Sequence, residues 1–300
     1  MMYQQMQKWE REITGWQHTK FLKQLMVILI QCKDLVGLVA EVAGVIAKQN
    51  INIVAMREHV DTVDNRFFVR IVVEGVQETL PVWQELKAIL PEGAEIAVNP
   101  STQKKVIVLV TKEYHCLGDI LIRNHFKTLG AEVQCVIGNH ETLQDVCRRF
   151  DIPFHLVSHE EKDKAIFEKE VLSIIEKYKT DYLVLAKFMR ILSPSFIEKF
   201  THSIINIHHS FLPAFVGANP YKKAYERGVK LIGATAHFVT NDLDEGPIIA
   251  QQIIHVNHSF TAPDMVKAGK EIETAVLARA MQLVFEERVL IWKNKTIIFE

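Results

Sequence analysis

The spacing of apolar residues follows two different patterns in the first third and in the rest of this chain, and these patterns restrict its fold more than any other feature of the sequence. Between Gln24 and about Thr102, runs of strand length and helix length follow in the order strand, helix, strand, strand, helix, strand. From Val106 onward, strands and helices alternate one for one. The second pattern is typical of a mainly parallel sheet with helices on both faces. The sequence therefore predicts an α/β protein made of two differently built parts.

The first part has the order β-α-β-β-α-β, which is the ferredoxin-like α+β arrangement. Its predicted elements are the strand Gln24–Cys32, a helix opened by Asp34 and Gly37 that ends near Asn50, the strands Ile53–Val63 and Arg66–Glu74, a helix that begins at Pro81, and the strand Ala94–Val98. Proline is tolerated in the first turn of a helix, because the amide hydrogen that it lacks has no partner there.

The second part opens with the run Val106–Val110, which is continuously apolar. Such a run is typical of a strand that is covered on both faces of the sheet. Further strands are predicted at Glu132–Gly138, Phe154–Val157, Tyr182–Ala186, Ile204–Ile207 and Leu231–Thr240, with helices up to Leu129, up to Phe150 and over Lys162–Lys179. This order predicts a doubly wound sheet, in which ligands bind outside the carboxyl ends of the strands. The polar segment Asn99–Lys105 separates the two parts. We predict domains over residues 21–100 and 104–300, preceded by a helix over residues 1–20.

The segment Met1–Lys20 carries its own helical pattern. Its apolar side chains recur at spacings of four and three residues and form one stripe of a helix, namely Met2, Met6, Trp9, Ile13 and Trp16. We expect this stripe to pack on the protein's own body or on a sister subunit. The alternative is a helix that docks on a membrane surface or on another partner.

The charge balance excludes several classes of partner. The chain carries a net charge of -1 with a pI near 6.9, so it lacks the basic footprint of a nucleic-acid binder or a polybasic membrane module. No apolar run approaches the ~20 residues that a membrane-spanning helix needs. The four cysteines form no C-x-x-C pair for zinc or thiol redox chemistry. These features predict a protein of a reducing compartment, the cytoplasm.

The predicted strand that ends in IINIHHS carries polar residues after an apolar lead. Because side chains alternate along a strand, Asn206 and His208 should share one face and His209 should point the other way. Asn206 can position or stabilise a group, and His208 can also transfer a proton. An acidic loop after the next strand supplies three carboxylates, Asp242, Asp244 and Glu245. One of them beside His208 would favour the protonated imidazole.

Simpler interpretations stay open at this point. The Asn-x-His pair also suits strand-end hydrogen bonding, and the acidic loop also suits a solvated turn or a helix cap. A metal site built from His208, His209 and His237 is disfavoured, because adjacent residues of a strand diverge. The sequence contains no glycine-rich motif for nucleotide binding.

The run LIQCKDLVGLVAEVAGVIAKQNINIV resembles an ACT domain, a regulatory module that binds small molecules. A D-x-x-G turn leads from its first strand into the helix, and N-I-x follows the helix. In that family, amino acids bind near the first turn, at an interface between paired modules. The resemblance implies a homo-oligomer formed through the ACT domains and an effector site at Asp34, Gly37, Leu38 and Asn52. The alternative is structural: Asp34 caps the helix and Gly37 only lets the chain turn.

Two longer runs, NIHHSFLPAFVGANPYKKAYERGV and IGATAHFVTNDLDEGPIIAQ, resemble the formyl-transferase fold that handles 10-formyltetrahydrofolate. The shared pattern is N-I-H-x-S-x-L-P, followed further on by H-F-V and L-D-x-G-P-I. The resemblance implies a catalytic trio of Asn206, His208 and Asp244. It also implies a folate-binding segment and a second pocket wall, made by Met189, Arg190, Ile191 and Leu192 and by Val239, Thr240 and Asn241.

Over almost the whole chain the sequence is similar to the formyltetrahydrofolate deformylase family, which joins an ACT domain to this catalytic domain. Runs such as VLVTKEYHCLGDIL, VIGNHETL and LAKFMRIL carry the likeness. The glycinamide ribonucleotide transformylase pattern fits less well. Its Gly/Ser/Asn phosphate loop is replaced by Thr111–Cys116, which has no glycine and carries Glu113. His209 also stands where that transformylase usually has proline.

The resemblance implies hydrolysis of 10-formyltetrahydrofolate to tetrahydrofolate and formate, which supplies formate for purine synthesis and balances the one-carbon pool. It implies no metal or redox cofactor, because the folate carrier already activates the formyl group. Methionine and glycine are the opposing effectors that the family suggests. The alternatives are a formyltransferase to an amine acceptor, such as glycinamide ribonucleotide, and a catalytically silent amino-acid sensor that binds folate only as a ligand.

Overall fold

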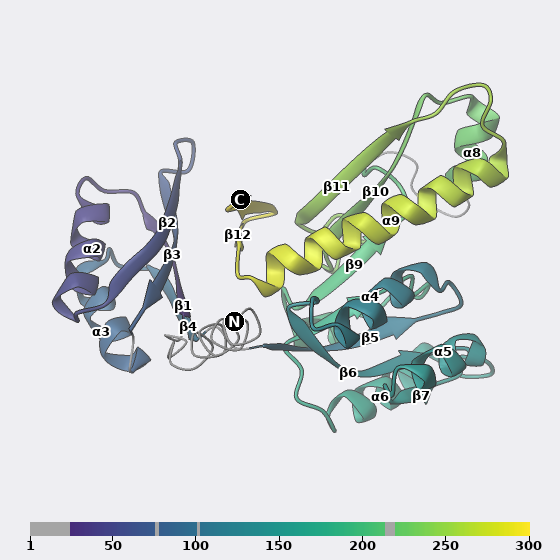
Figure 1. The fold of residues 1–300 in the computed structure, drawn as a ribbon, viewed down its shortest axis with the longest axis horizontal. Helices are drawn as coiled ribbons and strands as arrows, with labels where there is room; N and C mark the ends of the chain where they lie inside the picture. The colour runs from purple at the N-terminus through teal and green to yellow at the C-terminus, as the bar shows by residue number, and fades with distance from the viewer. Residues whose placement is uncertain (1–24, 76–77, 101–102, 214–219) are drawn as a thin grey trace, which may run out of the picture. The chain divides into compact units, whose positions relative to one another are not determined.

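The computed structural model describes residues 25–75, 78–100, 103–213 and 220–300. The chain splits into two compact units, Met1–Thr102 and Gln103–Glu300, called here the N-terminal and the C-terminal unit (Figure 1). The predicted helix Met1–Lys20 lies outside the described residues.

The N-terminal unit contains a four-stranded antiparallel sheet and two helices. Its elements are β1 Leu25–Lys33, α2 Leu38–Lys48, β2 Asn52–Asp61, β3 Arg66–Glu74, α3 Thr79–Ile89 and β4 Glu95–Pro100. The strand order β2-β3-β1-β4 is that of the ferredoxin-like arrangement, which confirms the predicted fold. The helix predicted from Pro81 begins slightly earlier, at Thr79, so that the proline still lies in the first turn.

Alternating residues of the central strand build the core of the N-terminal unit. Met26, Ile28 and Ile30 of β1 are buried in one cluster with Val42 and Ile46 of α2. Each fully buried side chain of this size stabilises the fold by roughly 1.5–3 kcal/mol. The strand alternation and the helix stripe seen in the sequence are therefore the two surfaces that fold against each other.

The turn before α2 depends on Gly37. Its backbone has φ +96°, a left-handed conformation that favours glycine, and it is the N-cap residue of α2. No side chain forms a hydrogen bond at this cap within the described part of the chain, so the helix-capping role considered for Asp34 is wrong. The backbone amide of Asp34 instead donates to the carbonyl oxygen of Asn65 at 2.9 Å.

The C-terminal unit contains a seven-stranded sheet and a separate hairpin. The strands of the sheet are β5 Lys104–Val110, β6 Ala131–Gly138, β7 Phe154–Leu156, β8 Tyr182–Leu185, β9 Ile204–His208, β10 Leu231–Phe238 and β11 Ile248–His255. The helices are α4 His115–His125, α5 Gln144–Arg149, α6 Lys164–Ile175, α7 Pro194–Ile197, α8 Pro220–Arg227 and α9 Ala262–Phe285, and the hairpin is β12 Val289–Trp292 with β13 Lys295–Ile298. The first six strands lie within a few residues of their predicted positions, whereas α8, β11 and α9 have no predicted counterpart.

The order of the strands in the large sheet is β11-β10-β9-β8-β5-β6-β7. Strands β5 to β9 run parallel, and β10 is antiparallel to both of its neighbours. This confirms the doubly wound, mainly parallel fold. After β5 the chain adds β6 and β7 on one side and then crosses to add β8 and β9 on the other. The switch between β5 and β8 is the usual position of a ligand site in such sheets.

Helices cover both faces of the large sheet. Val106 and Val108 of β5 belong to a buried cluster that includes residues of α4 and α9. Ile107 and Leu109 belong to a second cluster, with residues of α6 and α7. Figure 1 shows α9 running along β9, β10 and β11, which it contacts. The continuous apolar run of β5 thus reflects burial on two sides.

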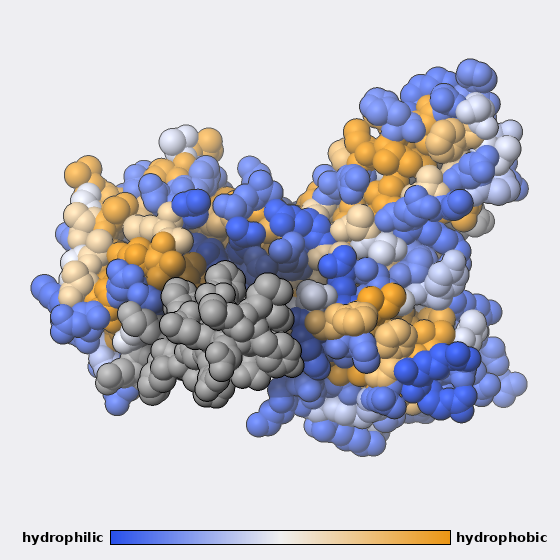
Figure 2. All heavy atoms as spheres, in the orientation of Figure 1, coloured by the Kyte–Doolittle hydropathy of each residue, from blue (hydrophilic) through white to orange (hydrophobic). Residues whose placement is uncertain are grey.

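No helix in the described ranges is long and apolar enough to cross a membrane. Figure 2 shows polar and apolar side chains interspersed over the visible face of each unit. The apolar patches on this face are therefore bordered by polar residues.

Candidate active site

A cavity of about 290 Å³ opens beside the carboxyl ends of β8 and β9. Three segments form its wall: the residues that follow β8, the end of β9, and the loop between β10 and β11. Every residue that the formyl-transferase resemblance assigns to catalysis or folate binding lines it, namely Met189, Arg190, Ile191, Leu192, Asn206, His208, Val239, Thr240, Asn241 and Asp244. Residues from three distant parts of the sequence thus meet in one place.

The imidazole of His208 is held on one side only. Its Nδ1 lies 3.2 Å from Oδ2 of Asp244, and its Nε2 is buried without a hydrogen-bond partner among the described residues. A buried polar atom without a partner costs free energy, and at a cavity it marks a place where a ligand completes the hydrogen bond. His208 therefore presents one ring nitrogen to the occupant of the cavity.

The pairing of β9 with β10 places His237 opposite Asn206. Nδ2 of Asn206 lies 3.1 Å from Nε2 of His237, and Nδ1 of His237 lies 2.8 Å from the carbonyl oxygen of Phe238. Because a carbonyl oxygen only accepts, Nδ1 of His237 carries the hydrogen. In the neutral ring, Nε2 then accepts from Asn206, which keeps its second amide hydrogen for another partner.

Sequence reasoning missed this role of His237, which entered only through the disfavoured metal grouping. Its position in the shared H-F-V motif was the one available signal. That signal does not say which residue of β9 lies opposite, because the register of two strands distant in sequence is set by tertiary packing.

Asp244 reaches His208 from a tight loop. Its backbone has φ +58°, and a Cβ on nearby Gly246 would lie 1.8 Å from the carbonyl oxygen of Phe238, so the close approach of loop and strand requires glycine there. The hydrogen bond from His208 and the proximity of His237 lower the pKa of Asp244 well below its usual range, against the opposing effect of burial.

The predicted direction of His209 is wrong. Its ring stacks on that of His208, with centroids 5.0 Å apart and planes inclined by 13°, and it lines the same cavity. The strand β9 ends at His208, so the alternation of side chains no longer fixes the residue that follows.

The segment 189–192 is fixed at both of its ends. The backbone amide of Met189 donates to Oγ1 of Thr111 at 3.0 Å. Ser193 donates its backbone amide to Oε1 of the buried Glu168 at 2.7 Å, and its hydroxyl donates to the same carboxylate. Between these ends, Met189 is 54% exposed. The segment thus presents apolar side chains from a fixed backbone, which suits a flat, partly apolar ligand.

The predicted effector residues do not all meet within one N-terminal unit. Lys33, which precedes Asp34, pairs with Arg66 at the start of β3, whereas Asn52 pairs with Glu74 at its end. The eight residue steps along β3 from Arg66 to Glu74 span about 26 Å. The turn that carries Asp34 and the start of β2 therefore lie at opposite ends of the sheet.

Gly37 and Leu38 lie close to Asp34, where α2 begins. Leu38 is 3% exposed and its side chain packs in the core, so only its backbone is available to a ligand. At the other end, the side-chain amide of Asn52 donates to Oε1 of Glu74 at 3.1 Å.

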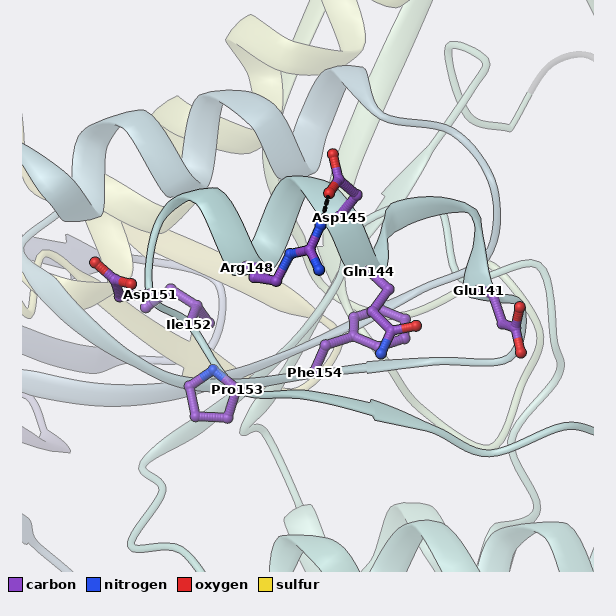
Figure 3. Close-up of a pocket in the computed structure, with 8 residues that line it drawn as sticks. All are labelled: Glu141, Gln144, Asp145, Arg148, Asp151, Ile152, Pro153 and Phe154. Atoms are coloured by element: carbon purple, nitrogen blue, oxygen red, sulfur yellow. Dashed lines mark hydrogen bonds and ion pairs between the residues drawn. The ribbon is translucent and has the colours of Figure 1, made fainter.

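A second depression lies between α5 and the edge strand β7 (Figure 3). With a volume of about 580 Å³ it is larger than the first cavity. The cation in its wall, Arg148, pairs with Asp145, and Pro153 and Phe154 supply apolar surface. No histidine and none of the predicted site residues lines it. The smaller cavity is therefore the candidate active site.

Two protein families match the chain in succession. Residues 26–90 match the ACT domain family, and residues 104–281 match the formyl transferase family. The first match falls in the N-terminal unit and the second in the C-terminal unit.

Some relatives match this chain over both parts and others over one. A formyltetrahydrofolate deformylase from Escherichia coli (strain K12) is 48% identical over 275 residues, which cover 92% of this chain and 98% of the relative. The crystal structure of a formyltetrahydrofolate deformylase from Pseudomonas syringae has a TM-score of 0.89 at 36% identity and covers 97% of this chain and 99% of that chain. A glycinamide ribonucleotide transformylase from Symbiobacterium toebii is less similar, with a TM-score of 0.64 at 27% identity over 70% of this chain and 100% of that chain.

Proposed function

Since the chain belongs to the formyltetrahydrofolate deformylase family, we propose that it hydrolyses 10-formyltetrahydrofolate to tetrahydrofolate and formate. In this role it supplies formate for purine synthesis and balances the one-carbon pool. The observation that carries the proposal is Nε2 of His208, which is buried at the cavity without a hydrogen-bond partner in the described part of the chain, beside an ionised Asp244.

Stabilisation of the formyl oxygen is the first task of the site. As water adds to the formyl carbon, that oxygen becomes an oxyanion, and preorganised donors contribute ~3–4 kcal/mol each. Nε2–H of protonated His208 and the second amide hydrogen of Asn206 are the two donors in this proposal. His237 acts through Asn206, because it fixes the orientation of the amide.

The attacking water is placed by Asp244. Oδ2 of this carboxylate holds His208, whereas Oδ1 lies 3.7 Å from Nε2 of His237, beyond hydrogen-bond length. Oδ1 thus keeps lone pairs that can accept a hydrogen from water. The lowered pKa of Asp244 makes it a weak base, so in this proposal it orients the water and stabilises the imidazolium more than it removes a proton.

The protons balance through His208. When the bond between the formyl carbon and N10 breaks, Nε2 gives its proton to N10, and the proton lost by the attacking water restores the imidazolium. Formic acid then ionises to formate. These steps use only water, the substrate and groups of this chain, so the proposal includes no metal or redox cofactor.

The folate is held by the fixed segment Met189–Leu192 on one side and by Val239, Thr240 and Asn241 on the other. Arg190 is exposed at the cavity and supplies a positive charge to an anionic ligand. Because Glu168 and Thr111 fix the ends of the segment, binding need not order its backbone.

The decisive experiment offers 10-formyltetrahydrofolate without any amine acceptor and measures formate. The proposal expects catalytic release of formate at a rate that scales with enzyme concentration. An acceptor-dependent formyltransferase or a silent folate-binding sensor would release none, and such a result would overturn the proposal.

The N-terminal unit has a regulatory role in this proposal. Its ACT fold supports binding of an amino-acid effector, with methionine and glycine as opposing candidates. Asp34 and Gly37 form the site in one unit, and Asn52 joins it only from a second copy, because it lies at the far end of its own sheet. Titrating each amino acid against formate release tests the effector, and sedimentation tests the homo-oligomer.

The cytoplasm is the proposed compartment. All four cysteines are free and buried in the structure, which agrees with a reducing environment. Burial raises the pKa of the Cys135 and Cys147 thiols to about 12, so these side chains pack as small apolar groups. Localisation of a tagged chain by fluorescence tests this part.

A further inference from the structure

A buried polar cluster lies next to the candidate active site and has no part in the mechanism above. At its centre is Glu273 of α9, which is 1% exposed. Its carboxylate accepts from Nε2 of His115 at 2.8 Å, from Nζ of Lys187 at 3.0 Å and from the hydroxyl of Tyr221 at 2.7 Å. These four residues, the Glu273 cluster, come from α4, the segment after β8, α8 and α9.

Within the Glu273 cluster, the negative charge of Glu273 is paired with the positive charge of Lys187. Burial alone would raise the pKa of Glu273, but the hydrogen bond from His115, the Lys187 ammonium and the hydrogen bond from Tyr221 outweigh it and lower this pKa to about 2. The carboxylate is therefore ionised and paired with Lys187. A buried ion pair of this kind adds little to stability compared with apolar packing, so its presence calls for another reason.

A metal site is not that reason. His115, Cys116 and Glu273 bring possible ligand atoms within 4.8 Å of one another. However, both oxygens of Glu273 already accept from protein donors, and the Lys187 ammonium places a positive charge where a cation would bind. Burial also raises the pKa of the Cys116 thiol, which disfavours the thiolate that a metal needs.

The Glu273 cluster adjoins the catalytic trio on the cavity wall. Lys187 lines the same cavity as Asn206 and His208, yet is itself only 8% exposed. The ring of His209 stacks on His208 and lies 6.5 Å from the ring of Tyr221. The wall beside the reacting groups is thus formed by Lys187 and His209, with Glu273 and Tyr221 behind it.

The backbone at Lys187 is unusual for a residue with a side chain. It has φ +62°, a left-handed conformation that favours glycine. Strand alternation from Leu185 would place this side chain on the face covered by α6 and α7, but the left-handed turn lets it reach Glu273 of α9. A strained residue that persists beside an active site points to a function for its side chain.

We infer that the side chain of Lys187, held by Glu273, fills the space in which an amine acceptor would have to stand, and so restricts the nucleophile to water. The inference rests on the proposed hydrolysis. Water needs only a small volume and two or three hydrogen bonds. An amine acceptor needs room for the rest of its molecule, and on this side of the cavity the wall is occupied by the buried side chain of Lys187. Lys187 is therefore a specificity-determining residue rather than a catalytic one.

The test replaces Lys187 by glycine, which the left-handed backbone accommodates. Wild type and Lys187→Gly receive 10-formyltetrahydrofolate carrying a ¹³C-labelled formyl group, together with glycinamide in mildly alkaline buffer. NMR then measures labelled formate and labelled N-formylglycinamide. We expect the variant to raise the share of label on the amine by at least about tenfold, because a pocket that excludes a group by its shape discriminates by about that factor.

Lys187→Met is the matched control, because methionine keeps most of the bulk without the charge. It should still deliver the label to formate alone. The inference is overturned if Lys187→Gly divides the label between formate and amine as the wild type does. It is also overturned if Lys187→Met delivers label to the amine as readily as Lys187→Gly does. Should Lys187→Gly fail to fold, the double variant Lys187→Gly/Glu273→Gln takes its place, because it removes both partners and leaves no unpaired buried charge.

The outcome also separates this inference from the proposed function. If the wild type releases no formate without an acceptor, the proposed hydrolysis fails, whatever the variants do. If the wild type does release formate but neither glycine variant uses the amine, only the role of Lys187 fails.

Discussion

Among the described residues, the N-terminal unit buries almost only apolar side chains, whereas the C-terminal unit buries several charged and hydrogen-bonding side chains in addition to its apolar core. Among the described residues of the N-terminal unit, Gln31 is the one polar side chain in the buried class. In the C-terminal unit, the buried Lys187 and His208 line the candidate active site, the buried Glu273 pairs with Lys187, and the buried Glu168 binds Ser193 next to the segment 189–192. Burying a polar group costs free energy unless it is paired. The buried polar groups of the C-terminal unit therefore cost folding free energy, and we attribute their presence to function.

The difference also predicts how each unit should respond to mutation. In the C-terminal unit, replacing one buried polar group should change the activity or the pH dependence of stability more than it changes the packing of the core. In the N-terminal unit, backbone conformation and apolar packing should dominate. Four experiments, ordered from the largest expected effect to the smallest, test this contrast.

The largest effect is expected at the trio. Asp244→Asn and Asn206→Ala should each lower kcat for formate release by about 10²–10³-fold, because each removes a preorganised electrostatic group from the transition state. Circular dichroism should show an unchanged fold. Glu245→Gln, an exposed carboxylate in the same loop, is the control and should retain wild-type turnover. Near-normal rates in either trio variant would refute the assignment.

The next effect is a dependence of stability on pH. The pKa of Glu273 is lowered from 4.5 to about 2 in the folded state. The ionised carboxylate therefore stabilises the fold above pH 4.5, and this contribution is lost as the pH falls toward 2. Across that window the free energy of unfolding should drop by about 3 kcal/mol more in the wild type than in Glu273→Gln. Urea unfolding at several pH values measures it.

Glu271→Gln is the control for this experiment, because Glu271 is exposed on the same helix. It should reproduce the wild-type dependence on pH. Equal slopes for Glu273→Gln and the wild type would show that the Glu273 carboxylate gains nothing from its partners.

A smaller effect is expected at Glu168, which holds one end of the segment 189–192 that is proposed to bind folate. Glu168→Ala removes the acceptor of both Ser193 hydrogen bonds. Since Ser193 follows the segment 189–192, the KM for 10-formyltetrahydrofolate should rise about tenfold while kcat changes less. Steady-state kinetics measure the split. Glu170→Ala, on the same helix and paired with Lys162, should leave KM unchanged; a pure loss of kcat at Glu168 would contradict the positioning role.

The smallest effect concerns the N-terminal unit and uses two glycines of the same region. Gly37→Ala should destabilise it by about 1 kcal/mol, because alanine is strained at φ +96°. Gly44→Ala should stabilise it by about 0.5–1 kcal/mol, since Gly44 lies in α2 with open space around its Cα. Thermal unfolding of the full chain shows both shifts. Shifts of the same sign would contradict the backbone argument.

Much of the fold could be predicted because its signals are local. The strand predicted at Arg66–Glu74, after the turn residues Asp64 and Asn65, matches β3 to the residue. The continuous apolar run Val106–Val110 likewise identified a strand buried on both faces. Helix ends were less well predicted: α6 ends at Ile175 rather than Lys179, because its last polar residues fit a helix and a loop equally well.

The candidate site was predicted only in part. The resemblance named Asn206, His208 and Asp244, and the structure brings them to one cavity. It could not supply His237, whose role follows from the register of β9 and β10. It also could not supply the direction of His209, because strand geometry ends one residue earlier.

By itself, the sequence determined the position of most strands and helices, because the spacing of apolar side chains follows the local backbone geometry, with a period of about 3.6 residues in a helix and 2 in a strand. The tertiary structure alone decided which polar side chains meet. Lys187 and Glu273 form an ion pair across a long stretch of chain, and Asp34 and Asn52 lie at opposite ends of one sheet. Such encounters depend on strand register and on how helices pack over the sheet, and neither leaves a periodic trace in the sequence.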